Sequence, residues 1–269
     1  VLISGSIYIF FEYDANKSLI SNLIDGFWWA IVTITTVGYG DYYPKTLAGR
    51  IIAVPVIIFG LGFIGILVGS ITSNLFSKRI KAMKGLLNYN LSNHIVICGW
   101  NQEKIDILIK EIKNSSILAK KEIILVNNVL EENPFPATEK IYFVKGLQSD
   151  LDVLKRASIQ NCSHAIVISD TNNPHSDDTT VLTVLLIATI NNKIFTCAEL
   201  LDIKKIDLLK SANCNEIITA TDFSTKLLVQ SIEDPGLSTV INELITNKQG
   251  AQIDSMPVDK SYENKIIEE

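Results

Sequence analysis

The sequence predicts an α-helical membrane region followed by a doubly wound α/β domain. The 27 residues from Ile51 to Ser77 contain no Asp, Glu, Lys, Arg or His, and a helix needs only about 20 apolar residues to cross a bilayer. A second uncharged run of 15 residues, Gly26 to Gly40, precedes it. From about Asn93 onward, short apolar runs alternate with amphipathic stretches. This alternation is typical of a parallel sheet whose strands are joined by helices.

The first apolar segment is incomplete. Val1 to Phe11 is uncharged but has 11 residues, about half of a membrane span. We expect either that the chain is a fragment that begins inside a span, which we favour, or that this segment is only the end of one. The segment has no basic n-region and no small-residue cleavage site, so it does not match a signal peptide.

The uncharged run Gly26 to Gly40 is too short to cross the membrane but long enough for a helix that enters halfway and returns. It ends in the stretch TTVGYGD, Thr35 to Asp41. TVGYG is the sequence of potassium-channel filters, in which backbone carbonyls replace the hydration shell of the ion. Glycine adopts positive φ angles without strain, which lets the backbone turn its carbonyls to one side.

We therefore predict a selectivity filter that holds K⁺. One strand cannot surround an ion, so the filter implies a homotetramer with the filter on its axis. A hydroxyl and a carbonyl are expected from the first filter residue and carbonyls from those that follow. The predicted filter residues are Thr36, Val37, Gly38, Tyr39 and Gly40.

Aromatic residues open the half-span, as is usual at a membrane interface. Trp29 and Asp41 stand on either side of the helix and filter. We predict that the Trp29 indole donates a hydrogen bond to the Asp41 carboxylate and braces the outer mouth. Simple anchoring of the helix at the interface would explain Trp28 equally well.

The apolar run after the filter contains Gly60, Gly62, Gly65 and Gly69, with Pro55 before them. Glycine and proline weaken a helix, so this run is suited to bend or to pack closely. We predict a gating hinge at Gly60. Close helix packing in the membrane is the alternative explanation.

A basic linker, residues 78–92, follows the apolar run directly, with Lys78, Arg79, Lys81 and Lys84 at its start. By the positive-inside rule these residues are cytoplasmic, so the filter faces outward. The net charge of −5 argues against nucleic-acid binding. The four cysteines have no CxxC spacing and are expected to be free thiols in a reducing compartment.

Residues 93–247 are predicted to form the α/β domain, with two further helices at its end. Its buried strands are β-branched and apolar on both faces. They are HIVICGW (94–100), EIILVNN (122–128), KIYFVKG (140–146), HAIVISD (164–170), KIFTCAEL (193–200) and NEIITA (215–220). Helices are expected at Phe223 to Glu233 and Leu237 to Thr246, and residues 248–269 are expected to begin a truncated C-terminal part.

The first turn of this domain departs from a dinucleotide fingerprint. GxGxxG is replaced by GWNQEK, in which only Gly99 stands, and Asn127 and Asn128 occupy the place of the usual acidic residue. This disfavours NAD at the first turn. A mononucleotide at the strand ends stays open, with Gly99, Asn101 and Asn127 as candidate ligands.

Carboxylates gather near the predicted ends of the fourth and fifth strands, where ligands of such sheets bind. Oxygen-rich sites suit calcium, so Asp170, Asp177 and Glu199 are candidate regulatory Ca²⁺ ligands. Solvated or helix-capping carboxylates are the alternative. The three histidines show no ligand spacing.

Together, TTVGYGDYYP, the glycine-rich helix, the basic linker and NHIVICGW resemble prokaryotic potassium channels with two membrane helices per subunit and a cytoplasmic RCK domain (regulator of conductance of potassium). CAELLDIKKIDLLK and QSIEDPGLSTVINELI are similar to the calcium-gated and multi-ligand-gated branch with tandem RCK domains. The resemblance implies a potassium channel pore domain over residues 1–77 and a Rossmann-like RCK lobe after it.

The resemblance further implies an octameric gating ring in which RCK domains pull on the inner helices when a ligand such as Ca²⁺ or an adenine nucleotide binds. Calcium-gated relatives carry two acidic residues one apart after the fifth strand. Here Cys197-Ala198-Glu199 lacks one of them, which counts against calcium there. A regulatory subunit of a potassium transporter would share the lobe but lack a filter, and an NAD-dependent enzyme would need an intact fingerprint. We expect a multi-pass cell-membrane protein that is not an enzyme.

Overall fold

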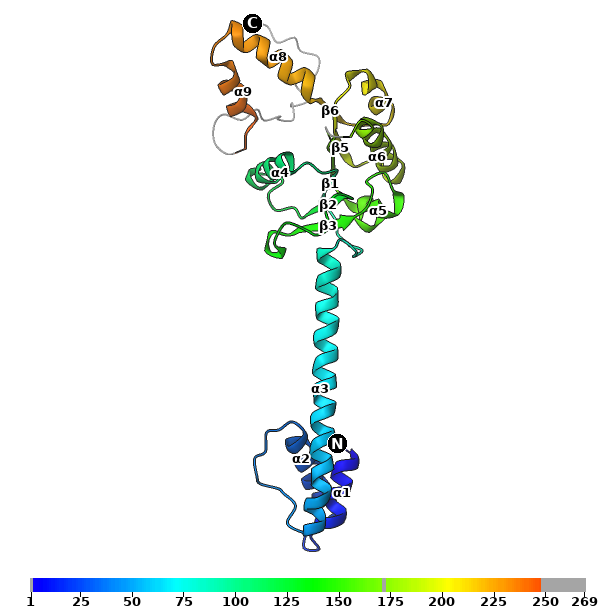
Figure 1. Ribbon diagram of the computed structural model, residues 1–269, viewed down its shortest axis with the longest axis vertical. Coiled ribbons are helices and arrows are strands. Elements are labelled where there is room, and N and C mark those ends of the chain that lie inside the picture. Colours follow the sequence, from blue (N-terminus) through cyan, green and yellow to red (C-terminus); the bar gives the residue numbers. More distant parts are fainter. Residues whose placement is uncertain (1, 171–172, 248–269) are drawn as a thin grey trace, which may run out of the picture. The chain divides into compact units, whose positions relative to one another are not determined.

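The computed structural model describes residues 2–170 and 173–247. They divide into two compact units, with the boundary between Arg79 and Ile80. Figure 1 labels the helices and strands along the chain. Each unit is described on its own.

The first unit is helical. It contains α1 (Leu2–Glu12), α2 (Leu19–Ile34) and most of α3 (Leu47–Met83). Among the described residues, α3 alone is long and apolar enough to cross a membrane, and α1 and α2 are shorter apolar helices. At 1.5 Å per residue the 37 residues of α3 extend over about 55 Å, more than the roughly 30 Å of a hydrocarbon core.

Glycines let α1 and α2 approach closely. A Cβ built on Gly26 would lie 2.7 Å from the Gly5 carbonyl oxygen, and one on Gly5 would lie 2.7 Å from the Phe27 ring. No larger residue fits at this crossing without displacing a helix. Next to it, Trp29, Ala30 and Ala53 form the small buried core of the unit.

Helix α3 continues through the basic residues to Met83. The predicted linker of residues 78–92 therefore begins as helix rather than as a separate connection. The helix is stopped just after Met83 by Gly85, whose φ of 64° is left-handed. Leu86 N donates to Lys81 O at 2.8 Å and Gly85 N to Ala82 O at 3.2 Å. This pair of bonds is the Schellman arrangement that closes a helix at glycine.

The second unit contains a six-stranded parallel sheet in the order β3-β2-β1-β4-β5-β6. This is the strand order of a doubly wound dinucleotide-binding fold, and the switch point lies between β1 and β4. The strands are β1 (Ile95–Cys98), β2 (Ile123–Asn127), β3 (Ile141–Lys145), β4 (His164–Val167), β5 (Phe195–Leu200) and β6 (Glu216–Thr219). All six predicted strands are confirmed.

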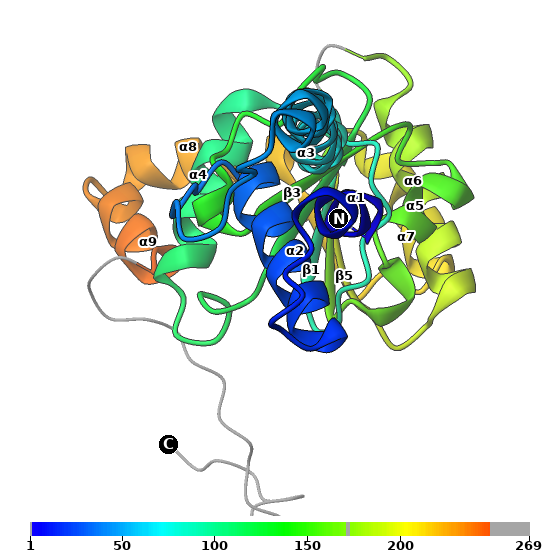
Figure 2. The same ribbon diagram turned by 90° about the horizontal axis from the view of Figure 1, so that it is seen from below.

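Helices cover both faces of this sheet. Figure 2 shows α4 on one side of the strands and α5 and α6 on the other. Alternate residues of β1 accordingly enter different cores: Ile95 and Ile97 pack with α4, whereas Val96 and Cys98 pack with residues of α5 and α6. The covering helices are α4 (Gln102–Asn114), α5 (Leu151–Arg156), α6 (Ser176–Ile190) and α7 (Ile206–Ser211).

Three short 3₁₀ turns complete the lobe: η1 (Ala137–Glu139), η2 (Ile159–Asn161) and η3 (Ile203–Lys205). The chain then forms α8 (Ala220–Glu233) and α9 (Leu237–Ile245). Their residue ranges nearly match those of the two predicted helices. Neither helix has a buried residue. The part predicted to begin at residue 248 lies outside the described residues.

Candidate ion filter and ligand pocket

The predicted filter has an alternating backbone. Thr36, Gly38 and Gly40 have φ angles of 62°, 58° and 77°, and the residues between them are not left-handed. Such alternation turns successive carbonyls to one side of the strand, which is the arrangement that ion coordination by carbonyls requires. Gly38 and Gly40 adopt it without steric cost, whereas a threonine with positive φ is uncommon and is held there by its surroundings.

The start of the predicted filter is hydrogen-bonded to the last turn of α2. Val32 O accepts hydrogen bonds from Val37 N at 3.0 Å and Gly38 N at 3.2 Å. Thr36 N donates to Thr33 O at 3.1 Å. No atom lies within 4 Å of a Cβ built on Gly38 or Gly40. The filter strand of a single chain is therefore anchored at its base and open at its sides.

Asp41 is braced by Trp28 and not by Trp29, so the predicted Trp29 contact is wrong. Trp28 Nε1 donates to Asp41 Oδ2 at 2.7 Å. The Trp28 ring also stacks on the Tyr39 ring at 5.9 Å with an interplanar angle of 4°. Trp29 is buried and stacks on Tyr8 at 4.9 Å. Neighbouring helical residues point about 100° apart, so only one of the two can face the filter.

Gly60 lies against the end of the pore helix. A Cβ built on Gly60 would lie 2.8 Å from Ile34 Cγ1, whereas Gly62, Gly65 and Gly69 meet nothing within 4 Å. Close packing therefore accounts for Gly60 in this conformation. Its role as a hinge stays a prediction.

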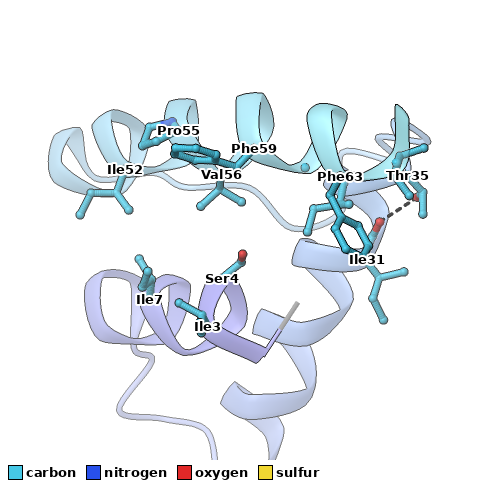
Figure 3. A pocket seen from close by; sticks show the side chains of 13 residues that line it. Ile3, Ser4, Ile7, Ile31, Thr35, Ile52, Pro55, Val56, Phe59 and Phe63 are labelled. Atoms are coloured by element: carbon cyan, nitrogen blue, oxygen red, sulfur yellow. Dashed lines mark hydrogen bonds between the residues drawn. The ribbon is translucent and has the colours of Figure 1, made fainter. Parts of the chain in front are cut away.

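Next to Gly60 the three helices line an apolar cavity of about 580 Å³ that is open on one side. Figure 3 shows Ile3 and Ile7 of α1 pointing toward Val56 and Phe59 of α3. Thr35 closes one end, and its hydroxyl donates to Ile31 O at 2.7 Å. The cavity thus lies behind the pore helix and inside the first unit.

A contact that the sequence did not predict ties α1 to the start of α3. Glu12 Oε1 accepts hydrogen bonds from Thr46 N at 2.8 Å and Thr46 Oγ1 at 2.6 Å. Thr46 Oγ1 in turn accepts from Gly49 N at 3.0 Å, which caps the helix. A Cβ on Gly49 would lie 2.5 Å from Glu12 Oε1. The spacing T-x-x-G after proline signals the cap, but the partner 34 residues away carries no local signal.

A small pocket of about 110 Å³ lies at the carboxyl ends of β1, β2, β3 and β4. Gly99, with φ of 102°, follows β1 directly, and a Cβ there would lie 2.5 Å from Ile168 O. The pocket is lined by Gly99, Trp100, Asn127, Asn128, Val129, Leu147, Gln148, Ile168, Asp170, Asn173, Ser176 and Thr179. It occupies the crevice in which doubly wound folds bind ligands.

The three predicted nucleotide ligands are placed differently. Gly99 and Asn127 line this pocket, whereas the Asn101 side chain caps α4 by accepting a bond from Lys104 N at 3.1 Å. Asn127 Oδ1 accepts from Leu130 N at 2.9 Å. Asn127 Nδ2 and Gln148 Oε1 are buried without a hydrogen-bond partner. Both atoms belong to residues that line the pocket.

The predicted calcium ligands do not form a metal site. Within residues 2–170 and 173–247, no group of three or more His, Cys, Asp or Glu side chains is placed to hold a metal ion. Glu199 is paired with Lys104, whose Nζ lies 2.6 Å from Oε1 and 2.8 Å from Oε2. Asp177 accepts bonds from Leu201 N at 3.0 Å and Asp202 N at 2.8 Å. Asp170 lines the pocket instead. Local hydrogen bonds thus occupy carboxylate oxygens of Glu199 and Asp177 that calcium would need.

Comparison with known proteins matches different families to the two structural units of the chain. Residues 1–77 match the family described as "Ion channel", and residues 90–198 match "Calcium-activated potassium channel slowpoke-like RCK domain". The calcium-gated potassium channel TvoK of Thermoplasma volcanium is 30% identical over 261 residues, covering 95% of this chain and 73% of TvoK. The putative potassium channel protein YugO of Bacillus subtilis is 28% identical and covers 81% of this chain and 66% of its own length.

Solved structures show the same fold. The GsuK channel bound to NAD and GsuK bound to ADP each align with a TM-score of 0.54 at 19% identity over 81% of this chain. This chain spans 38% and 56% of those two chains, respectively. The relatives are potassium channels, so the Rossmann-like unit does not make this protein an NAD-dependent enzyme. The chain belongs to the family of prokaryotic potassium channels in which a pore is followed by an RCK domain.

Proposed function

We propose that four copies of this chain form a potassium-selective pore whose opening is controlled by a ligand bound to the RCK domain. The observation that carries the proposal is the backbone of Thr36 to Gly40, in which positive φ angles alternate with others. Hydrogen bonds join the start of this segment to the end of α2. In a tetramer, four such strands would surround an axis with carbonyl oxygens. The pore helices lie in the membrane and the RCK domain in the cytoplasm, as in the family.

The pore helix adds to the electrostatics. Helix α2 leads with its C-terminal end into the filter, and the last carbonyls of a helix carry a partial negative charge. In a low-dielectric membrane this charge favours a cation at the inner end of the filter. The Thr36 hydroxyl and carbonyl would then take over the ion from water.

Purified wild-type protein in liposomes should carry potassium flux, and a Gly38→Ala variant should lose it because alanine disfavours a φ of 58°. Lys155→Gln, an exposed change in α5, is the matched control. A potassium-transporter subunit shares the RCK unit but has no filter, so it would carry no flux alone. Equal flux in wild type and Gly38→Ala would reject the filter.

For assembly, we infer that RCK domains pair through α8 and α9 in an octameric gating ring. Support comes from large apolar side chains that are exposed on these helices in the single chain. They are Phe223, Leu228, Val229, Ile232, Val240 and Ile245. Burying such side chains against another domain stabilises an assembly by about 25 cal/mol per Å² of apolar surface.

For the ligand, the geometry favours an adenine nucleotide over calcium at the strand ends. GsuK has been solved with NAD and with ADP, and TvoK is described as calcium-gated. Here Gly99, Asn127 and Gln148 line a pocket at the strand ends, where doubly wound folds bind nucleotides. The pocket of about 110 Å³ is below the 300–1,000 Å³ that encloses a whole ligand, so only part of a nucleotide would be enclosed.

Thermal unfolding of the full chain with ADP, NAD or Ca²⁺ tests this choice. ADP or NAD should raise the melting temperature, and Gln148→Leu should remove that rise because the variant lacks the acceptor. Gln160→Leu, on the exposed surface beyond α5, is the control. Stabilisation by Ca²⁺ alone would reject the nucleotide assignment.

A further inference from the structure

The peptide that follows α3 is clamped to the RCK unit by one arginine. Gly85 O accepts hydrogen bonds from Lys145 N at 3.0 Å and from Arg156 Nη1 at 3.1 Å. Arg156 Nη2 donates to Lys145 O. A single guanidinium at the end of α5 thus bonds the exit of α3 and the end of β3 at once. The planar fork of arginine allows this geometry, and a lysine ammonium does not reproduce it.

No other residue fits at the clamped position. A Cβ built on Gly85 would lie 2.4 Å from Lys145 N and 2.8 Å from the Phe143 ring, and its φ of 64° is left-handed. The same glycine closes α3 by the Schellman bonds of Leu86 and Gly85 to the last helical turn. The end of the helix and the clamp are therefore one rigid feature.

Further bonds hold the segment on both sides of Gly85. Asn133 N donates to Met83 O at 2.8 Å. Tyr89 N donates to Arg156 O at 2.9 Å, and Tyr89 O accepts from Ser158 Oγ at 2.6 Å. These hydrogen bonds fix residues 83–89 to the rest of the RCK unit, so the segment is not a flexible linker.

The clamp also adjoins the ligand pocket through the chain. Lys145 ends β3, and Leu147 and Gln148, two and three residues later, line the pocket. Gly146 between them donates to Asn127 O at 2.9 Å. A Cβ on Gly146 would lie 2.4 Å from Val153 of α5, the helix that ends in Arg156. A shift of the segment from Gly146 to Gln148 would therefore also move Lys145 and Arg156, the two residues that bond Gly85 O.

We propose that Arg156 and the Gly85 peptide form the element that carries occupancy of the pocket to α3. Arg156 acts as a positioning residue, because it lines neither the pocket nor the filter. This inference rests on the proposed ligand control of the pore. It adds that the signal passes between the end of β3 and the middle of the linker, at Gly85, by hydrogen bonds between backbone groups and one guanidinium.

The test uses the full-length tetramer in planar bilayers, with ADP and NAD as probes. In Arg156→Lys, potassium selectivity and thermal stabilisation by the nucleotide should persist. The nucleotide-dependent change in open probability should fall about fivefold or more, the lower end of allosteric coupling factors. Lys155→Gln, the exposed neighbour in the same helix, should respond as wild type. An unchanged nucleotide response in Arg156→Lys would overturn the inference.

Two further measurements keep the test decisive. If Arg156→Lys does not assemble, Gly85→Ala breaks the same clamp from the other partner and should give the same loss of response. If wild type responds to neither nucleotide, the ligand assignment fails and hydrogen exchange decides on the clamp. The amide hydrogens of Lys145 and Leu86 should then exchange about tenfold faster in Arg156→Lys than in Lys155→Gln, as loss of about 1.4 kcal/mol predicts. Equal rates would overturn the clamp.

Discussion

Trp28 Nε1 donates a hydrogen bond of 2.7 Å to Asp41 Oδ2, across the loop that contains the filter. The Trp28 ring also lies parallel to the Tyr39 ring. One side chain of the pore helix therefore contacts the filter tyrosine and the aspartate after the filter. This double contact restricts the outer end of the carbonyl strand.

Removing that hydrogen bond should make the filter less stable. Trp28→Phe keeps an aromatic ring but removes the donor, and Asp41→Asn leaves only a neutral amide oxygen as acceptor. A hydrogen bond to a charged group contributes roughly 1.5–3 kcal/mol when shielded, and the exposed position here argues for about 1 kcal/mol, or fivefold. We expect both variants to inactivate several-fold faster in single-channel recordings.

Trp29→Phe is the matched control, because Trp29 stacks on Tyr8 and does not bond Asp41. It should lower the stability of the helix pair without a specific change in inactivation. Faster inactivation in Trp29→Phe than in Trp28→Phe would contradict this assignment.

Gly60→Ala should change gating through packing at the pore helix. The added methyl would lie 2.8 Å from Ile34 Cγ1, and overpacking of this kind costs typically 1–3 kcal/mol. We expect a lower open probability in bilayer recordings, since alanine stiffens the helix at the predicted hinge and so disfavours bending. Gly62→Ala, which meets no atom within 4 Å, is the control. Unchanged open probability in Gly60→Ala would remove the hinge prediction.

The Lys104–Glu199 pair should stabilise the RCK domain and not bind calcium. Glu199 Oε2 also accepts a hydrogen bond from Ser169 N at 3.1 Å, and the carboxylate is largely buried. Either Lys104→Gln or Glu199→Gln should lower the free energy of unfolding by about 1–3 kcal/mol. The double variant should lose less than the sum of the two, as a double-mutant cycle by urea unfolding would show. If Glu199→Gln abolished a response to Ca²⁺, the pairing would not be its main role.

Acid should destabilise the RCK domain through His94. Burial lowers the pKa of His94, whose Nε2 lies 3.0 Å from Ala157 O and whose Nδ1 has no partner. Burial, together with the nearby Lys121, lowers the pKa of His164 as well. The unfolded chain thus binds protons more readily than the folded chain below the ordinary histidine value of 6.5.

Stability is therefore fully present above pH 6.5 and is lost as the pH falls below it, by at most about 1.4 kcal/mol per pH unit for each histidine. His94→Gln keeps a donor for Ala157 O and should flatten this pH dependence of the unfolding free energy. A pH profile as steep as that of wild type would contradict the role of His94.

The sheet was predictable because its strands are continuous apolar runs that are buried on both faces. Val96 and Ile97 enter opposite cores, so neither tolerates a polar residue, and the pattern is visible in one sequence. The turns within the predicted filter segment were predictable because Gly38 and Gly40 adopt positive φ angles there. Both signals are local.

The remaining contacts depend on which face a side chain presents. Trp28 and Trp29 are alike in composition, and only the rotation of α2 decides which one reaches Asp41. Lys104 takes the place of the third fingerprint glycine and meets Glu199, 95 residues away. Neither partner has a local signal, and the pairing of Glu199 with Lys104 separates it from the other two predicted calcium ligands.

The carbonyl oxygens of the proposed filter should distinguish K⁺ from Na⁺. The direct measurement is the reversal potential of the reconstituted wild-type channel with potassium on one side of the bilayer and sodium on the other. We predict a potential displaced strongly in the direction that potassium selectivity requires. A reversal potential near zero for the wild-type channel would contradict the account.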